Sequence, residues 1–327
     1  MSKILVTGGA GYIGSHACKA LAAAGYTPVT YDNLSTGWED AVKFGPFERG
    51  DLLDKARLDE VFALHRPTAV MHFAALSQVG EATTDPGTYW RNNVCGSLTL
   101  VEAAVAAGCL DFVFSSTCAT YGDQDGVVLD EECVQAPLNA YGASKRAIEE
   151  LLGHFEISHG LRSVVFRYFN VAGADPDGEV GEFHQPETHL IPIMLDAIEG
   201  KRDALTINGT DYDTPDGTCV RDYVHVMDLV EAHVMGLIWL QNGKGSRVFN
   251  LGTGSGFSVR EVVRHSGAVT NRPVPISEGP RRAGDAAVLV SGSVWAKTEL
   301  GWSPHRSTLE TMISDAWRWH QGTGYAK

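Results

Sequence analysis

The chain has 327 residues, long enough for one large domain with a smaller lobe or for two domains, with 44% hydrophobic and 20% charged residues. A net charge of −14 and a pI near 5.2 argue against nucleic acid or an anionic membrane as the main partner, because both bind basic surfaces. An anionic small substrate remains compatible with this charge, since a local cluster of arginines can hold one.

The cysteine and histidine patterns argue against disulfide bonds and metal sites. The six cysteines are scattered, without a C-x-x-C pair or zinc-finger spacing, so we expect free thiols in a reducing compartment. The histidines include no H-E-x-x-H motif, and the sequence predicts no metal site. No secretory leader pattern follows Met1, and no apolar run reaches the roughly 18 residues of a spanning helix. A cytoplasmic protein is expected.

Residues 1–170 alternate short apolar, β-branched runs with helical stretches. We expect extended runs at 3–9, 27–33, 47–54, 68–75, 111–117 and 163–170, and helices at 12–24, up to 65, at 86–107 and around 139–145. Strands that alternate with helices form βαβ units. The fold class predicted is therefore α/β, a doubly wound parallel sheet covered by helices on both faces.

The organisation loosens after residue 170. Residues 171–182 and 208–218 are rich in Gly, Pro, Asp and Thr and lack sustained periodicity, which favours loops over a site. We expect a smaller C-terminal α/β lobe over residues 171–327 that binds the substrate. Residues 221–255, with a helix near 227–239, are expected to return to the first domain.

A glycine-rich turn, T-G-G-A-G-Y-I-G, follows the first strand and opens the first helix. Gly8, Gly11 and Gly14 would let the backbone turn tightly and approach a pyrophosphate, whose charge meets the helix N-terminus. A tight turn without a ligand is the simpler alternative, but the strand-turn-helix context favours a dinucleotide. The turn therefore predicts a nicotinamide cofactor in a Rossmann domain.

Two carboxylates lie where an adenosine could meet them. Asp32 ends the second strand, where it can accept hydrogen bonds from a ribose, and no arginine follows closely to hold a 2′-phosphate. NAD is thus preferred over NADP. Asp51, followed by Leu52, could meet the adenine or could equally be a helix N-cap.

The stretch N-A-Y-G-A-S-K places Tyr141 and Lys145 on one helix face. A surface pair is the simplest interpretation of these two residues. However, Ser115, Ser116 and Thr117 end a strand some 25 residues earlier, where ligands of such sheets bind. A tyrosine, with a reference pKa of about 10, can act as a base near neutrality if an ammonium and a cationic nicotinamide ring lower its pKa.

With these features together, the chain resembles the extended short-chain dehydrogenase/reductase family and, within it, the UDP-glucose 4-epimerases. The resemblance runs from residue 3 to about 319 and is carried by the glycine-rich turn, by Y-x-x-x-K, and by these segments: YDNLSTG (31–37), HFAAL (72–76), FSSTCATYGD (114–123), RYFN (167–170), DYDTPDGTCVRDYVHVMDL (211–229), FNLGTG (249–254) and RRAGD (281–285).

The resemblance implies reversible 4-epimerisation of UDP-galactose and UDP-glucose through a transient 4-keto sugar, with tightly bound NAD. Tyr141 would be the base at the sugar 4-hydroxyl, Lys145 would lower its pKa and hold the nicotinamide ribose, and Thr117 would shuttle the proton. A homodimer is implied too, joined through helix 86–107 and the helix of Tyr141.

The resemblance also assigns two sets of binding residues. The implied cofactor-binding residues are Gly8, Gly11, Tyr12, Ile13, Gly14, Asp32, Asn33, Leu34, Ser35, Thr36, Gly37, Asp51, Leu52, Phe73, Ala74, Ala75, Ser77, Asn92, Tyr141, Lys145 and Phe169. The implied substrate-binding residues are Thr117, Tyr141, Asn170, His189, Leu190, Thr206, Ile207, Asn208, Arg221, Arg282, Asp285 and Leu289. Arg221 and Arg282 would hold the diphosphate, because a planar guanidinium can meet two phosphate oxygens at once.

Three residues depart from a well-studied form of the family. Thr117 replaces a Ser but keeps the hydroxyl, and Ser77 replaces a Lys near the NAD pyrophosphate. Leu289 stands where a Tyr or Cys governs the entry of an N-acetyl group, and its bulk favours exclusion of N-acetylated sugars.

Three other functions have some support in the sequence. A 4,6-dehydratase would place Asp and Glu after the strand-end Thr, where this chain has Cys118 and Ala119. A 4-epimerase for UDP-arabinose, UDP-xylose or a UDP-N-acetylhexosamine is the closer alternative. An NAD-sensing protein without catalysis would have little use for Tyr141, Lys145 and the strand-end hydroxyl together.

Overall fold

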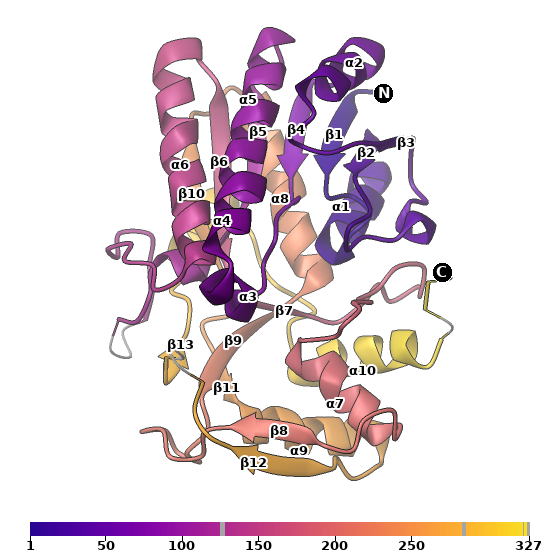
Figure 1. Cartoon of the computed structure of the whole chain (residues 1–327), viewed down its shortest axis with the longest axis vertical. Coiled ribbons are helices and arrows are strands. Elements are labelled where there is room, and N and C mark those ends of the chain that lie inside the picture. Colours follow the sequence, from indigo (N-terminus) through magenta and orange to yellow (C-terminus); the bar gives the residue numbers. More distant parts are fainter. Residues whose placement is uncertain (125–127, 283–285, 323, 326–327) are drawn as a thin grey trace.

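Residues 3–168 supply six strands of a seven-stranded parallel sheet and β10 supplies the seventh, in a computed structural model that describes residues 1–124, 128–282, 286–322 and 324–325 (Figure 1). The strand order is β10-β6-β5-β4-β1-β2-β3, so the direction of winding reverses between β1 and β4. Ligands of doubly wound sheets bind at such a switch point, beyond the carboxyl ends of the strands. The strands are β1 Lys3–Thr7, β2 Thr27–Asp32, β3 Phe47–Arg49, β4 Ala69–His72, β5 Asp111–Thr117, β6 Arg162–Tyr168 and β10 Arg247–Leu251.

Two helical layers bury both faces of this sheet. Val6 packs in one apolar core with α1 Tyr12–Ala23 and α8 Val226–Gln241, whereas its neighbour Leu5 packs in a second core with α2 Lys55–His65, α5 Gly96–Ala106 and α6 Ala140–His159. Successive strand residues point to opposite faces, so a strand buried on both sides must be apolar throughout. This explains the unbroken apolar runs in the sequence and confirms the predicted α/β class.

The predicted helix 86–107 is present but not uniform. Asp85 caps α4 Pro86–Tyr89 by accepting a hydrogen bond from the backbone N–H of Thr88, and the chain passes through the π-helical segment η2 Trp90–Cys95 into α5. A π-helical turn is wider than an α-helical one and often occurs at functional sites. The remaining short elements outside the lobe are α3 Val79–Thr84 and the single turns η1 Glu39–Ala41, η3 Cys118–Thr120 and η4 Ala296–Leu300.

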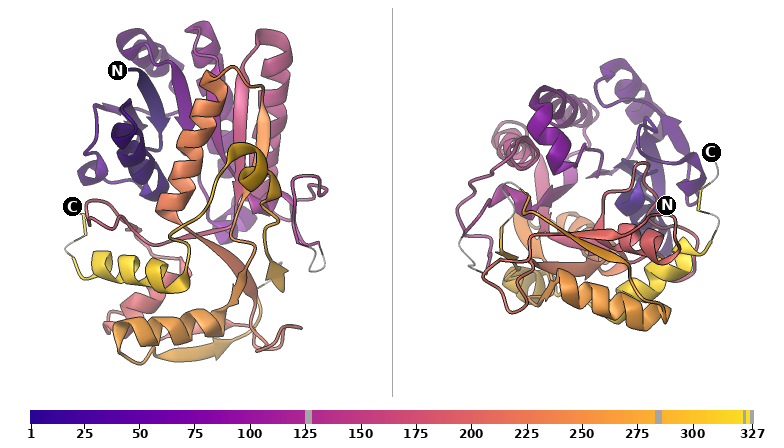
Figure 2. Two further views of the ribbon diagram at one scale, coloured as in Figure 1. Left: turned by 180° about the vertical axis from the view of Figure 1, so that it is seen from behind. Right: turned by 60° about the horizontal axis from the view of Figure 1, so that its bottom comes forward.

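A second lobe lies beyond the carboxyl ends of the large sheet, towards which its strands point (Figures 1 and 2). Its strands are β7 Asn170–Ala172, β8 Leu205–Asn208, β9 Val220–His225, β11 Gly256–Ser258, β12 Ile276–Gly279 and β13 Val288–Leu289. Its helices are α7 Leu190–Ile198, α9 Val259–Thr270 and α10 Leu309–His320, which share a third apolar core. The chain enters the lobe through β7. It later returns to the first domain, where α8 packs in the same core as α1 and β10 forms an edge strand of the large sheet.

The cysteines and helices agree with the composition. All six cysteines are free thiols. Within the described residues, no helix combines the length and the apolarity needed to cross a bilayer.

Candidate active site

The glycine-rich turn closes tightly at the end of β1. Gly8 has a φ of +73°, and a Cβ on it would lie 2.6 Å from the backbone nitrogen of Ala74. A Cβ on Gly14 would lie 2.1 Å from the carbonyl oxygen of Gly8, so both positions exclude a side chain. A Cβ on Gly11 would meet only the Gly8 oxygen, at 3.3 Å, which leaves the approach to the start of α1 open. This cradle fits the pyrophosphate of a dinucleotide.

Asp32, at the end of β2, lies against this turn. One carboxylate oxygen accepts from the backbone N–H of Ala10 at 3.0 Å, and the other accepts from that of Leu34 at 2.8 Å. Burial raises the pKa of Asp32, and these backbone hydrogen bonds offset part of that effect. A carboxylate has about four acceptor sites, so Asp32 can still receive a hydroxyl donor of a ribose.

The loop after Asp32 covers the turn. Leu34 has a φ of +60°, Ser35 and Thr36 are exposed, and a Cβ on Gly37 would lie 3.0 Å from Ala10. The backbone N–H of Trp38 then donates to the carbonyl of Ala10 at 2.9 Å.

Asp51 contacts Asn33, as a shared adenosine site would require. Its carboxylate accepts from the Asn33 amide at 2.9 Å and from the backbone N–H of Leu53 at 2.9 Å. The alternative that Asp51 caps α2 is wrong, because Asp54 is the N-cap and accepts from the backbone of Arg57. Leu52 is buried in the core against α5, where a Cβ on Gly96 would lie 3.0 Å from it.

Residues after β4 continue along the glycine-rich turn. The backbone N–H groups of Phe73 and Ala74 donate to the carbonyl of Thr7 at 2.9 and 3.1 Å. Ala75 is half-buried and Ser77 is exposed, and Tyr12 and Ile13 open α1 opposite them. The hydroxyl of Tyr12 donates to the carbonyl of Gly173 at 2.6 Å and so ties α1 to the lobe.

Asn93, which the sequence analysis missed, organises this region. It is fully buried in η2, next to the predicted Asn92, and its amide both accepts from and donates to the backbone of Leu76. It also donates to the hydroxyl of Ser144 on α6, at 3.1 Å. Asn93 therefore couples the loop after β4 to the helix of Tyr141. The sequence did not indicate this role, because it depends on the π-helical geometry of η2.

Tyr141 and Thr117 meet at the strand ends. Thr117 ends β5, is 7% exposed, and its hydroxyl is hydrogen-bonded to the phenol of Tyr141. Lys145, one turn along α6, is 3% exposed, and its ammonium donates to the carbonyl of Ser115 at 2.8 Å. The three residues predicted for catalysis are thus brought together.

Burial sets the charges of this group. It raises the pKa of Tyr141, and the neighbouring Tyr168 raises it further, while the hydrogen bond with Thr117 lowers it. Burial also lowers the pKa of Lys145 to about 7, although Glu149 opposes the shift. In the chain itself the pKa of Tyr141 is therefore raised, and the predicted lowering depends on the cationic ring of the bound cofactor.

The helix that carries Tyr141 is positioned at its first turn. Asn139 is its N-cap and accepts from the backbone N–H of Gly142 at 2.9 Å. A Cβ on Gly142 would lie 2.3 Å from the carbonyl oxygen of Ala119, so only glycine lets α6 approach η3, the turn after β5, this closely. Tyr168, at the end of β6, is the register partner of Thr117 and hydrogen-bonds to Ser115. Its proximity could be predicted only from the strand register.

The predicted substrate residues line the lobe side of the strand ends. Phe169 is buried against Tyr121 and Leu129, and Asn170 begins β7 with its side chain exposed. His189 is the N-cap of α7, and Leu190 packs at its first position in the lobe core.

Strand β8 and its neighbours carry the other predicted substrate residues. Thr206 is exposed, Ile207 is buried, and the Asn208 amide oxygen, in the orientation that satisfies its neighbours, accepts twice from Arg282 at 3.1 Å. Arg221 on β9 and Leu289 on β13 are register partners. Asp285 lies outside the described residues.

Comparisons with known proteins agree with this geometry. Residues 4–252 match the model of the NAD dependent epimerase/dehydratase family. A UDP-glucose 4-epimerase of Rhizobium meliloti is 52% identical over 319 residues, which cover 98% of this chain and 97% of the relative. A crystal structure of UDP-glucose 4-epimerase is 50% identical, with a TM-score of 0.97 and complete coverage of both chains.

A further solved structure contains the cofactor. UDP-glucose 4-epimerase from Brucella ovis, in complex with NAD, is 47% identical with a TM-score of 0.95, covering 97% of this chain and 98% of that one. Sequence identity and fold agree over nearly the whole chain, and the family model matches residues 4–252 of it. The chain belongs to the NAD dependent epimerase/dehydratase family.

Proposed function

We infer that the chain is an NAD-dependent UDP-glucose 4-epimerase that interconverts UDP-galactose and UDP-glucose. The observation that carries this function is the meeting of Tyr141, Thr117 and Lys145 at the strand ends, beside the glycine cradle. Relatives named UDP-glucose 4-epimerase are up to 52% identical to this chain and match it over nearly their whole length. They support the same activity.

Tyr141 acts as the base for the sugar 4-hydroxyl. When bound, NAD supplies the redox chemistry by accepting the hydride from sugar C4 and giving it back on the other face. Thr117, hydrogen-bonded to the phenol, passes the proton between the sugar oxygen and Tyr141. Lys145 lies one turn after Tyr141 on α6, where its amine holds the ribose and, when protonated, favours the ionised phenol.

The cofactor is held by the segments gathered around the glycine-rich turn. The start of α1 faces the pyrophosphate, and Asp32 accepts hydrogen bonds from the adenosine ribose. Asp51 and Asn33 lie beside the adenine. Ser77, being exposed and neutral, contributes no charge to the pyrophosphate.

Arg221 and Arg282 hold the diphosphate of the UDP-sugar. The guanidinium of Arg282 is already oriented by two hydrogen bonds to Asn208, which lowers the entropy lost on binding. His189 and Leu190 at the start of α7, Thr206 and Ile207 on β8, and Asn170 and Asp285 complete the predicted set.

Leu289 limits the size of the sugar that the site accepts. It packs with Tyr121, Leu129 and Phe169, so its branched side chain is backed by a rigid apolar cluster. We expect an N-acetyl group to be excluded, and UDP-pentoses are the alternative substrates that this wall does not exclude.

The chain is also proposed to be a homodimer. Two helical stretches are predicted to meet across the interface: residues 86–107, which form α4, η2 and α5, and the helix of Tyr141, α6. They carry Val94, Val105, Leu151 and Phe155 as only partly buried apolar residues, and Ile157 is 86% exposed. Sedimentation that shows only monomers at micromolar concentration would contradict this assembly.

The activity is tested by incubating the purified protein, without added cofactor, with UDP-galactose, UDP-N-acetylgalactosamine and UDP-arabinose separately, and by following the 4-epimers by NMR. Conversion of UDP-galactose alone is expected. Conversion mainly of another sugar would keep the mechanism and change the substrate. No conversion of any sugar, even with NAD supplied, would leave a protein that binds NAD without catalysis.

A further inference from the structure

The loop between β7 and α7 gathers two glutamates and two histidines, Glu182, His184, Glu187 and His189. One ligand atom from each lies within 4.8 Å of the others. The Nδ1 atom of His189 lies 2.8 Å from a Glu182 oxygen and 3.3 Å from a Glu187 oxygen. The Nδ1 atom of His184 lies 3.4 and 3.6 Å from oxygens of the same two residues.

These separations match those within a tetrahedral metal site. Nitrogen and oxygen ligands lie about 2.0–2.2 Å from zinc, which places neighbouring ligand atoms of a tetrahedron about 3.3–3.6 Å apart. Four of the six residue pairs already have ligand atoms between 2.8 and 3.6 Å apart, with His189 and His184 facing different oxygens of Glu187. Only small rotations of the side chains would be needed to surround an ion.

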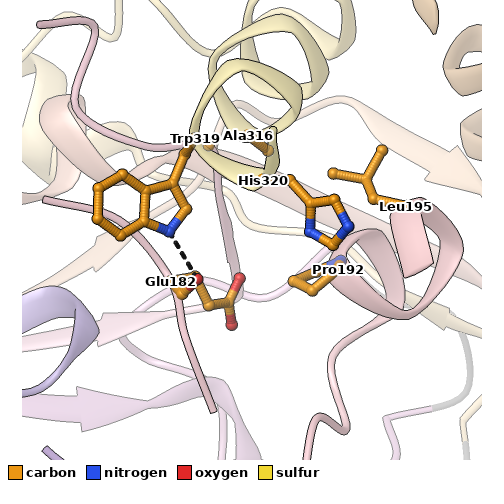
Figure 3. Close-up of a pocket in the computed structure, with 7 residues that line it drawn as sticks. Glu182, Pro192, Leu195, Ala316, Trp319 and His320 are labelled. Atoms are coloured by element: carbon orange, nitrogen blue, oxygen red, sulfur yellow. Dashed lines mark hydrogen bonds between the residues drawn. The ribbon is translucent and has the colours of Figure 1, made fainter. Parts of the chain in front are cut away.

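The loop is held in place by contacts outside the cluster. One oxygen of Glu187 accepts from the backbone N–H groups of Thr188 and His189, at 2.7 and 2.8 Å. The indole of Trp319 donates to the backbone carbonyl of Glu182 at 2.9 Å (Figure 3), and the indole of Trp38 donates to that of Phe183 at 2.8 Å. Such outer contacts orient metal ligands before an ion binds.

A small pocket borders the cluster at Glu182. It lies between α7 and α10, and the carboxylate of Glu182 and the imidazole of His320 both line it (Figure 3).

A second cluster of carboxylates in the chain already has a lysine as its counter-ion. Asp175, Asp177 and Glu179 also gather within ligand distance, but the ammonium of Lys19 contacts all three at 2.6–2.7 Å. By contrast, within the described residues the ion pairs of Glu182 and Glu187 are all with the two histidines, and the buried Nδ1 atom of His184 makes no hydrogen bond.

We propose that Glu182, His184, Glu187 and His189 bind one divalent cation of the zinc type, through two imidazoles and two carboxylates. Zinc accepts both imidazole nitrogens, which are ligands of borderline softness, and carboxylate oxygens, which are hard ligands. Four such ligands satisfy its preference for tetrahedral coordination. The two carboxylates require a charge of +2, which one such ion supplies. The ion would fix the start of α7, where His189 and Leu190 face the proposed substrate site. The proposal stands whether or not the chain is an epimerase.

Co²⁺, which takes the same geometry as zinc and absorbs visible light, tests the site. The purified protein would be stripped with a chelator, dialysed, and titrated with Co²⁺ at pH 8. We expect one equivalent to bind per chain with the intense d–d bands of four-coordinate Co²⁺, and equimolar Zn²⁺ to remove the colour. Zn²⁺ should also raise the melting temperature of the stripped protein.

Matched variants separate this site from other ligands. His184→Gln and Glu187→Gln, which keep size and hydrogen-bonding capacity, should each weaken Co²⁺ binding at least tenfold, on the order of the 10–100-fold effects seen for metal-site substitutions. Asp177→Asn, in the cluster occupied by Lys19, should leave the binding unchanged. Circular dichroism of all three variants checks that they are folded.

Several results would overturn the proposal. These are an absence of equimolar binding, weak six-coordinate spectra shared by wild type and all variants, and equal losses in Asp177→Asn and His184→Gln. Each of them would leave the cluster as an ion-pair network in which the histidines themselves carry the charge.

Discussion

Tyr141 and Lys145 are both driven by burial towards their neutral forms. The pKa of the phenol is raised and that of the ammonium is lowered to about 7, so neither group is strongly charged near neutrality in the chain alone. Only the ionised phenol can take the proton of the sugar hydroxyl, and burial makes that form costly. The positive charge that tips this balance comes with the cofactor, which links proton transfer to hydride transfer.

Replacing Tyr141 by Phe tests the proposed base. The change removes one oxygen from a side chain that is otherwise positioned by α6, so bound NAD should be retained. Turnover should fall by at least about 10²–10⁴-fold, the usual contribution of a general acid-base group. Turnover is measured by NMR and bound NAD by its absorbance after denaturation. Substantial remaining epimerisation would place the base elsewhere.

Gly14→Ala tests the cofactor cradle. The new Cβ would lie 2.1 Å from the carbonyl oxygen of Gly8, and a backbone atom cannot yield without displacing the turn. We expect the variant to lose copurifying NAD and about 1–3 kcal/mol of stability, as overpacked sites do. Gly153→Ala on α6 is the control, because no atom lies within 4 Å of its Cβ and NAD should stay bound. Equal NAD content in both variants would mean that the cofactor does not approach this turn.

Among the elements, α6 does most to assemble the proposed site. Its Glu149 accepts from Arg167 on β6 and from Ser116 on β5, and the side chains of Glu149 and Arg167 are each 8% exposed. The neighbouring Glu150 pairs with Arg146 on the same helix, but these side chains are 60% and 42% exposed. The two glutamates therefore offer a comparison within one helix turn.

Glu149→Ala should cost about 3–5 kcal/mol of unfolding free energy, because it leaves the buried guanidinium of Arg167 without its partner. Glu150→Ala should cost no more than about 0.5 kcal/mol, since exposed pairs contribute little. Urea unfolding of both variants gives the comparison. Similar losses in the two would show that the buried pair does not anchor the helix.

The elements also show what the sequence can and cannot reveal. Strands buried on both faces were predictable because their apolar runs are continuous, and the glycine-rich turn because its residues are adjacent in the chain. The run 47–54 forms a strand only at Phe47–Arg49, since the chain then turns to the cap at Asp54. The short lobe strands β7, β8 and β13 depend on partners far away in the sequence, which no local pattern encodes.

The same distinction holds for site residues. Tyr141 and Lys145 are one helix turn apart, so their shared face could be predicted. Asn93 acts through a π-helical turn, and the histidines of the proposed metal site meet their glutamates through the path of a loop. Such contacts depend on backbone geometry that composition and spacing do not specify.

For the molecule as a whole, acid sensitivity follows from three buried histidines of the first domain. Burial lowers the pKa of His16 and His233 to about 4 and that of His72 to about 3. Between pH 6.5 and about 4 the unfolded chain binds protons at these positions and the folded chain does not. Stability therefore falls as pH falls through this window, by about 1.4 kcal/mol per pH unit for each histidine, and is unaffected by them above it.

His233→Phe isolates one of these contributions. The imidazole packs among the rings of Phe73, Phe166 and Tyr168, and its Nε2 atom has no hydrogen-bond partner, so a phenyl ring suits the site. Relative to wild type, the variant should gain about 2 kcal/mol of stability on going from pH 8 to pH 5, because its unfolded state no longer takes up that proton. Urea midpoints of both proteins at the two pH values give this difference, from which the carboxylates common to both cancel. A difference that is the same at pH 5 and pH 8 would mean that His233 titrates normally in the folded protein, and that its ring is reached by water through the packed interface of α8 with the sheet.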